Sequence, residues 1–156
     1  MLPKYPDWQW DLYGTGDTLD EIRKKIEEYG LEKQLILKGN VKDVYQVYGD
    51  YAFLVLPSYR EGLPLVLLEA KALGLPMISF DITTGPREII NEGEDGYLIP
   101  PYHIEEMAAK IETLIIDEKQ RILFSKNTEK GIEKFCKRRI YSEWEELIET
   151  LCGGEE

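Results

Sequence analysis

Hydrophobic positions in residues 1–100 fall into short runs, separated by stretches in which they recur at helical spacing. Residues 8–13 alternate aromatic and polar side chains and stop at a glycine loop, which predicts a strand followed by a helix up to Gly30. Further strands are predicted wherever a short apolar run ends at glycine, proline or a polar turn. They cover residues 34–37, 52–56, 76–80 and 97–99, and the helices between them cover 41–48, 65–73 and 86–91.

This alternation of strands and helices predicts an α/β fold of the Rossmann-like, doubly wound kind, with one parallel sheet. The run 52–56 is wholly apolar and is closed by Pro57, as expected for a strand that is covered on both faces. In the helix before it, Val44, Tyr45 and Tyr48 should face the core, because they recur at helical spacing.

The chain beyond Ile104 is predicted to be helical throughout, with breaks near Asp117 and Gly131 and an amphipathic helix at the end. A chain of 156 residues can bury one proper core but is too short for two Rossmann-sized domains. We therefore expect a single domain over residues 1–152, followed by a loose tail at 153–156.

Composition places the chain among soluble globular proteins, since 43% of its residues are apolar and 31% are charged. No apolar run approaches the roughly 20 residues that cross a bilayer, and no basic and apolar leader opens the chain. We expect the protein to be cytoplasmic, with the full-length protein located at the inner face of the membrane.

The formal charge is −11, from 30 acidic and 19 basic residues, and this sign argues against binding to a nucleic-acid backbone. A diphosphate would have to be held by local backbone N–H groups, a helix N-terminus or a few placed cations. Cys136 and Cys152 show no metal-ligand spacing and are expected to be free thiols. The single histidine, His103, follows two prolines in a loop, so catalysis based on histidine is not expected.

The richest candidate site is the turn after the strand 52–56, because ligands of doubly wound sheets bind beyond the carboxyl ends of the strands. Gly62 lets a ligand approach the backbone, and Pro64 suits the start of the helix that follows. Glu61 lies in the turn, and Glu69 lies about two helical turns further on, within an otherwise apolar helix. A structural alternative is that Glu61 caps the helix and Glu69 pairs with a lysine.

Seven residues separate Glu61 from Glu69, and this segment resembles the Glu, seven residues, Glu signature of retaining glycosyltransferases of family 4, which have the GT-B fold. The resemblance covers nearly the whole chain. It includes the glycine loop 14–16, the strand end 37–41 and the segment 84–98, whose form is common among polysaccharide-assembly members. It implies that the chain is the C-terminal, donor-binding domain of such an enzyme.

By this resemblance, Glu69 accepts hydrogen bonds from the ribose hydroxyls of a nucleotide sugar. Glu61, at the catalytic position, contacts hydroxyls of the transferred sugar. The backbone of Gly62, Leu63 and Pro64 faces the sugar and the diphosphate. Ionised carboxylates only accept hydrogen bonds and so suit vicinal diols, whereas the leaving diphosphate needs N–H donors. No metal ion and no cofactor are required.

The resemblance also implies a UDP-sugar as the favoured donor and the transfer of a hexose-type sugar to a glycan or lipid-linked acceptor in cell-surface polysaccharide assembly. Asp81 and Glu88 are weaker candidates for contact with the donor, since Glu88 can simply begin a helix. Further donor-binding positions are Gly14, Gly16, Lys38 and Val41.

The family's domain opens with a strand ending in Gly-Arg and a helix carrying a lysine, and nothing in this sequence corresponds to them. The first strand and helix and the N-terminal acceptor-binding domain are thus expected to be missing, so the chain should bind its donor weakly and not transfer sugar alone. The missing strand would be the central one. We therefore expect either direct closure of the gap or self-association through the incomplete sheet, giving a homo-oligomer.

Two other readings compete. A dehydrogenase is suggested by the strand, Gly14-x-Gly16 and helix, but Leu19 occupies the third glycine position, and no acidic residue ends the next strand. An α/β nucleotide-binding or interaction module of the flavodoxin or receiver type, without transferase chemistry, leaves Glu61 and Glu69 unexplained.

Overall fold

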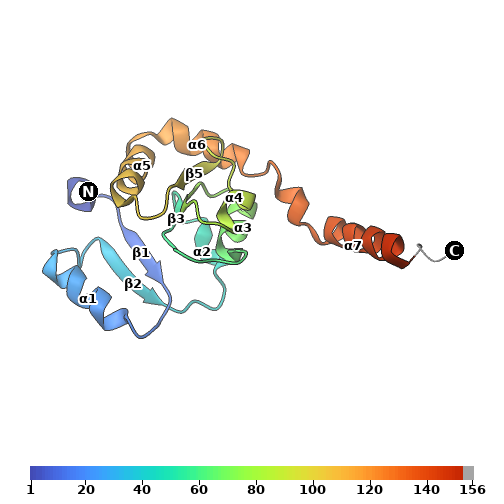
Figure 1. Ribbon diagram of the computed structural model, residues 1–156. Helices are drawn as coiled ribbons and strands as arrows, with labels where there is room; N and C mark the ends of the chain where they lie inside the picture. The colour runs from blue at the N-terminus through green and yellow to red at the C-terminus, as the bar shows by residue number, and fades with distance from the viewer. Residues whose placement is uncertain (153–156) are drawn as a thin grey trace.

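Five short parallel strands are divided between two sheets. The computed structural model describes residues 1–152 and has the strand order β1-β2 in one sheet and β3-β4-β5 in the other (Figure 1). Every pairing is parallel, as predicted. The strands are β1 (Trp10–Tyr13), β2 (Leu35–Gly39), β3 (Leu54–Leu56), β4 (Met77–Phe80) and β5 (Gly96–Ile99).

Helices lie on both faces of the three-stranded sheet, which gives the doubly wound α/β arrangement. Strand β4 is buried along its whole length, and its side chains alternate between two cores. Met77 packs with α2, α3 and α4, whereas Ile78 and Phe80 pack with α5 and α6. The helices are η1 (Leu2–Lys4), α1 (Leu19–Glu28), α2 (Tyr45–Tyr48), α3 (Leu65–Ala72), α4 (Pro86–Ile89), α5 (Ile104–Ile116), α6 (Glu118–Asn127), η2 (Ile132–Phe135) and α7 (Lys137–Cys152).

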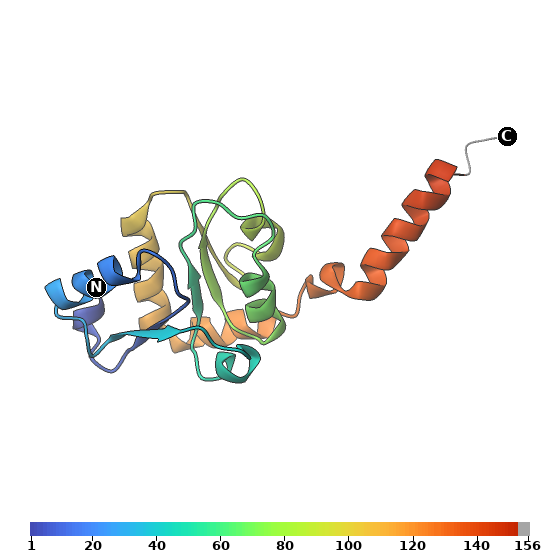
Figure 2. The same cartoon turned by 90° about the horizontal axis from the view of Figure 1, so that it is seen from below.

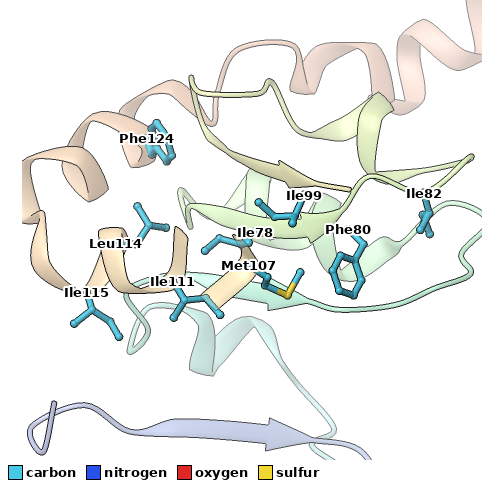
Figure 3. Close-up of a cluster of buried hydrophobic side chains, with 9 residues drawn as sticks. All are labelled: Ile78, Phe80, Ile82, Ile99, Met107, Ile111, Leu114, Ile115 and Phe124. Carbon is cyan, nitrogen blue, oxygen red and sulfur yellow. The ribbon is translucent and has the colours of Figure 1, made fainter. Parts of the chain in front are cut away.

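The larger of the two cores lies between the sheet and helices α5 and α6 (Figure 3). Phe124 and Leu114 are fully buried there, and the ring of Phe124 packs edge-on against Tyr97 of β5 at 5.0 Å, so α6 contacts the sheet directly. The cluster consists of Ile78, Phe80, Ile82, Ile99, Met107, Ile111, Leu114, Ile115 and Phe124.

One prediction about burial holds in part and one is wrong. Strand β3 was expected to be covered on both faces, and its side chains do pack against both cores, Val55 against one and Leu54 and Leu56 against the other. They are nevertheless only half-buried, because within residues 1–152 no strand pairs with the edge that faces β1. Tyr45 was expected to face inward, but 57% of its surface is exposed. Helix α2 is only four residues long, and Tyr48 is its one buried residue, so Tyr45 projects from the first turn.

The gap between β1 and β3 is open, so the expectation of direct closure is wrong. A cavity of about 410 Å³, here called the slot, lies between the two strands and is lined mainly by apolar residues of both. Within the part of the chain that the structure describes, only side chains bridge it: the rings of Trp8 and Phe53 lie 5.7 Å apart, and the hydroxyl of Tyr51 bonds to Asp11 of β1. Self-association stays a prediction.

The breaks predicted in the helical C-terminal region are confirmed. Asp117 ends α5 and caps α6, accepting a hydrogen bond from the backbone N–H of Gln120 at 2.9 Å. Gly131 has φ 77° and precedes η2. Helix α7 projects away from the rest of the chain, and none of its residues is buried (Figures 1 and 2). The expected tail, 153–156, lies outside the described residues.

No helix within residues 1–152 combines the length and the apolar character needed to span a membrane. Cys136 and Cys152 are both free, as predicted, and both are exposed.

Candidate functional site

The turn between β3 and α3 carries the first candidate carboxylate. Helix α3 begins after Pro64, whose extended ψ of 99° turns the chain into the helix. The N–H of Leu67 makes the first intrahelical bond, to the carbonyl of Pro64, so the N–H groups of Leu65 and Val66 stay available at the helix start. Gly62 and Leu63 are exposed just before this point, and Glu61 is half-buried.

The turn after β4 is packed directly against the turn after β3. The hydroxyl of Thr84 donates to the backbone carbonyl of Glu61 at 2.7 Å. Gly85 has φ 94°, and a Cβ atom there would lie 2.4 Å from the ring of Pro64 and 2.5 Å from the carbonyl of Gly62. Only glycine fits this position, because both its backbone conformation and its surroundings exclude a side chain. The two turns are therefore held in contact.

Glu69 is held by two tyrosine hydroxyls, and no salt bridge to it is found within residues 1–152. Tyr48 donates to Oε2 at 3.1 Å, and Tyr45 donates to Oε1 at the longer distance of 3.4 Å. The structural alternative, in which Glu69 pairs with a lysine, is therefore not what the structure shows. Both hydroxyls are neutral donors, so the negative charge of Glu69 is left uncompensated and its remaining lone pairs can accept further hydrogen bonds.

The environment of Glu69 keeps both tyrosines protonated. Burial raises the pKa of Tyr48, and the hydrogen bond to Glu69 and its charge raise it further. The charge of Glu69 is the largest cause of the raised pKa of Tyr45, followed by burial. A phenol that stays protonated remains a donor to the carboxylate, so Tyr48 fixes the orientation of Glu69 over a wide pH range.

Asp81 and Glu88 both have structural partners near the turn after β4. Arg87 forms two hydrogen bonds to Asp81, one of them 2.8 Å from Nε to Oδ1, and this pairing raises the pKa of the guanidinium. Glu88 accepts a hydrogen bond from the N–H of Gly85 at 3.3 Å and so caps α4. The expectation that Glu88 begins a helix is confirmed, and contact of either carboxylate with a donor stays a prediction.

The loops after β1 and β2 form a second group of candidate residues. Gly14 has φ 130°, and its N–H donates to the carbonyl of Gly39 at 2.8 Å. The side chain of Asn40 reaches the hydroxyl of Thr15 at 3.3 Å. Gly16 is exposed, whereas Val41 is half-buried. The structure thus brings the predicted positions of these two loops together.

Lys38 is engaged by Asp11 of β1, with its Nζ 3.1 Å from Oδ2, and Asp11 was not among the candidates from the sequence. Burial raises the pKa of Asp11, but hydrogen bonds from Tyr51, Gln9 and Lys38 outweigh it, and the net pKa lies below the ordinary value. The carboxylate therefore stays charged and holds the lysine.

Tyr51 connects β1 to the segment before β3, across the slot. Its hydroxyl donates to Asp11 and lies 2.5 Å from the hydroxyl of Tyr13. Burial is the largest cause of its raised pKa, followed by these two partners. Sequence reasoning missed this residue, since a tyrosine in a connection between a helix and a strand carries no signal of its partner.

Glu61, the exposed backbone of Gly62 and the N–H groups at the start of α3 thus lie beyond the carboxyl end of β3, and Glu69 lies further along the same helix. Such a set can accept hydrogen bonds from a diol and donate to a phosphate or developing oxyanion. Within residues 1–152 no cluster of histidine, cysteine, aspartate or glutamate is arranged to hold a metal ion.

Comparison with known proteins finds one matching family and relatives that include several glycosyltransferases. Residues 1–131 match the family described as glycosyl transferases group 1. The chain is 36% identical over 151 residues to an exopolysaccharide phosphotransferase of Streptomyces coelicolor, a match covering 96% of this chain and 16% of that protein. It is 34% identical over 143 residues to a poly(ribitol-phosphate) alpha-N-acetylglucosaminyltransferase of Staphylococcus aureus, covering 91% of this chain and 29% of that protein.

A crystal structure of a mutant of S. aureus TarM in complex with fondaparinux, alpha-GlcNAc-glycerol and UDP is similar over 94% of this chain and 30% of its own, with a TM-score of 0.87 and 33% identity. The chain spans less than a third of the length of each of these three proteins. Its architecture matches the C-terminal Rossmann-like domain of GT-B glycosyltransferases. The chain belongs to the glycosyl transferases group 1 family.

Proposed function

We propose that this chain is the donor-binding half of a retaining glycosyltransferase of family 4, which transfers a hexose-type sugar from a UDP-sugar to a glycan or lipid-linked acceptor during cell-surface polysaccharide assembly. Two kinds of observation support the proposal: the chemistry around Glu69, and relatives that include a poly(ribitol-phosphate) glycosyltransferase and a TarM complex containing UDP. The phosphotransferase relative is matched over only 16% of its length, so its named reaction is not carried over.

The environment of Glu69 is the observation that carries the proposal. An anionic carboxylate oriented by neutral hydroxyls keeps full strength as an acceptor, unlike one neutralised by a lysine. The 3.4 Å bond from Tyr45 is the weaker of the two and comes from an exposed side chain. In the proposed complex the ribose hydroxyls take the place of Tyr45, while Tyr48 continues to hold the carboxylate.

The transferred sugar is assigned to the interlocked turns after β3 and β4. Glu61 would accept hydrogen bonds from sugar hydroxyls, and the N–H groups of Leu65 and Val66 at the start of α3 would face the diphosphate. The loops that carry Gly14, Gly16, Lys38 and Val41 would border the nucleotide. The acceptor is assigned to a domain outside this chain, so the chain alone should bind a donor without transferring sugar.

Calorimetric titration with UDP tests the proposal, with GDP and NAD as comparison ligands. We expect UDP to bind and Glu69→Ala to weaken the binding by roughly 10- to 150-fold, the loss of hydrogen bonds to a charged group worth about 1.5–3 kcal/mol. Glu28→Ala, an exposed glutamate at the end of α1, is the matched control and should leave the affinity unchanged.

Binding of NAD in preference to UDP would support the dehydrogenase reading, and absence of any nucleotide binding would support an interaction module. Either result contradicts the proposal. Turnover of a UDP-sugar and acceptor by the isolated chain would contradict the assignment of the acceptor to a domain outside this chain.

A further inference from the structure

Three aromatic rings form a parallel stack at the carboxyl ends of β3, β4 and β5. Tyr59 is the middle ring, because its centroid lies 5.3 Å from that of Phe80 and 4.4 Å from that of Tyr102, with interplanar angles of 14° and 18°. Phe80 belongs to the larger core (Figure 3), and its surface is 2% exposed, against 47% for Tyr59 and 71% for Tyr102. The stack therefore extends from the core to the surface and ends on an exposed ring.

Each ring of the stack is supplied by a different strand end. Tyr59 follows β3, Phe80 is the last residue of β4, and Tyr102 follows β5. Tyr59 lies just before Glu61 in the same turn, and the hydroxyl of Thr84 joins this turn to the one after β4. The exposed ring of Tyr102 therefore lies at the same end of the sheet as the turns assigned to the transferred sugar.

The backbone of Tyr102 has an unfavourable conformation for a residue with a side chain. Its φ is 69°, and among the residues that the structure describes it is the one non-glycine residue with positive φ. Hydrogen bonds fix the loop at this point, from the N–H of His103 to Pro100 at 3.1 Å and from the N–H of Ile104 to Tyr102 at 2.9 Å. Glycine would adopt this conformation at lower cost. Backbone strain of this kind is concentrated at ligand sites, which points to a role for the ring.

The surroundings of the exposed ring favour a neutral sugar over an anionic ligand. Glu105 and Glu106 lie in the first turn of α5, directly after the loop that carries Tyr102, and both are exposed. Their charges repel a phosphate or an anionic lipid, whereas their oxygens accept hydrogen bonds from hydroxyl groups.

The hydroxyls of the two stacked tyrosines are also available to a ligand. Within residues 1–152, the tyrosines whose hydroxyls form hydrogen bonds are Tyr5, Tyr13, Tyr45, Tyr48 and Tyr51. An all-equatorial pyranose has apolar faces made of C–H groups and a rim of hydroxyls. Its C–H groups suit the negative face of an aromatic ring, and its rim suits the hydroxyls and carboxylates around that ring.

We infer that Tyr102, supported by Tyr59 and Phe80, stacks against one pyranose ring of a glycan next to the site of sugar transfer. The identity of this glycan as the acceptor rests on the proposed function, in which the reacting end of the acceptor is held by the domain outside this chain. A single stacked ring on an open surface gives a weak site, with a dissociation constant in the millimolar range. It contacts no part of the nucleotide, so UDP and the glycan should bind independently.

The test is a titration of the chain with cellotetraose, followed by NMR of the tyrosine ring protons. Cellotetraose is chosen because all ring substituents of its glucose units are equatorial. We expect saturable binding, which Tyr102→Ala weakens by roughly 5- to 150-fold, the contribution of one base stacked on an aromatic side chain. Tyr102→Trp keeps a flat ring and should retain the binding. Tyr29→Ala is the matched control, because Tyr29 follows α1 and is 68% exposed, and it should change nothing.

A purely structural role of the stack would give a different result. Tyr102→Gly removes the ring but also relieves the positive φ, so it should weaken the binding of cellotetraose as strongly as Tyr102→Ala without lowering the melting temperature. The affinity for UDP, measured by calorimetry, should be the same in all these variants. Loss of stability and of UDP binding together in Tyr102→Gly would make the ring a structural support and would overturn the inference.

No binding of cellotetraose, or equal binding by the unchanged chain and Tyr102→Ala, would also overturn it. So would equal binding of sorbitol, which has the hydroxyls but no ring, or tighter binding of adenosine than of cellotetraose, which would assign the ring to a nucleobase. Binding of cellotetraose through Tyr102 without any binding of UDP would contradict the proposed function and still support the glycan site, because the titration contains no nucleotide.

Discussion

Replacing Lys71 by methionine removes one side of an ion pair that is completely buried. Lys71 lies on α3, two residues after Glu69, and its Nζ donates to Asp95, with neither side chain exposed. Asp95 also accepts hydrogen bonds from the backbone and side-chain nitrogens of Asn91, at 2.9 and 3.0 Å. The pair therefore joins the helix of the candidate site to the segment before β5.

The expected loss of stability follows from this geometry. Breaking a buried pair from one side costs about 3–5 kcal/mol, because the remaining charge is left without its partner. The two bonds from Asn91 still solvate Asp95, so we expect the lower limit, about 3 kcal/mol. This is a large part of the roughly 5–15 kcal/mol that stabilises a typical domain. It corresponds to a melting temperature lower by about 6–12 °C for a chain of this size.

Thermal and urea unfolding, followed by circular dichroism, measure the loss. Lys130→Met is the matched control, because Lys130 pairs with Glu94 at 3.8 Å with both side chains about 60% exposed, and it should cost less than about 1 kcal/mol. Adding Asp95→Asn to Lys71→Met removes the uncompensated charge and should recover part of the stability. The reasoning fails if Lys71→Met costs no more than the control, or if the double variant is no more stable than the single one.

Three further substitutions test the site and its surroundings. Gly85→Ala should weaken UDP binding in calorimetry and destabilise the chain in thermal unfolding, because a Cβ would collide with the turn after β3. The control is Gly93→Ala, also at positive φ but in open space, which should lower the free energy of unfolding by only about 1–2 kcal/mol and leave binding unchanged. Tyr48→Phe should weaken UDP binding because Glu69 loses its closer donor, whereas Tyr45→Phe should not, and equal effects would contradict these roles. The pKa of Asp11 is lower in the folded chain than its ordinary value of 3.8, so the charged carboxylate stabilises the fold fully above pH 3.8. This stabilisation disappears as the pH falls through the pKa of the folded state. Asp11→Asn should therefore reduce the dependence of the unfolding free energy on acid pH, measured by urea unfolding.

The secondary structure was largely predictable because each element has a local signal. Alternating aromatic and polar residues mark β1, short apolar runs mark the other four strands, and Asp117 and Gly131 mark the breaks between the C-terminal helices. Tyr45 was misplaced because helical spacing does not define which residue begins a four-residue helix. The hydrophobic pattern could not predict the open slot, because the slot depends on whether β1 and β3, which are distant in the sequence, pair with each other.

The candidate site was predictable in its positions but not in its contacts. The spacing of Glu61 and Glu69 pointed to the turn after β3 and to α3, where both residues lie. The tyrosine partners of Glu69 come from α2, more than twenty positions earlier, and such a contact has no local sequence signal. The partner of Lys71 is equally distant, so a buried lysine inside an apolar helix could not be recognised beforehand.

The contact between Gly85 and Pro64 has a consequence for engineering the proposed donor site. Since the turns after β3 and β4 are in van der Waals and hydrogen-bond contact, a library that varies one of them alone will mostly return variants in which the other is displaced. The effects of substitutions in the two turns should be strongly non-additive. Productive changes of the proposed sugar site will therefore require that both turns be varied together, with glycine retained at position 85.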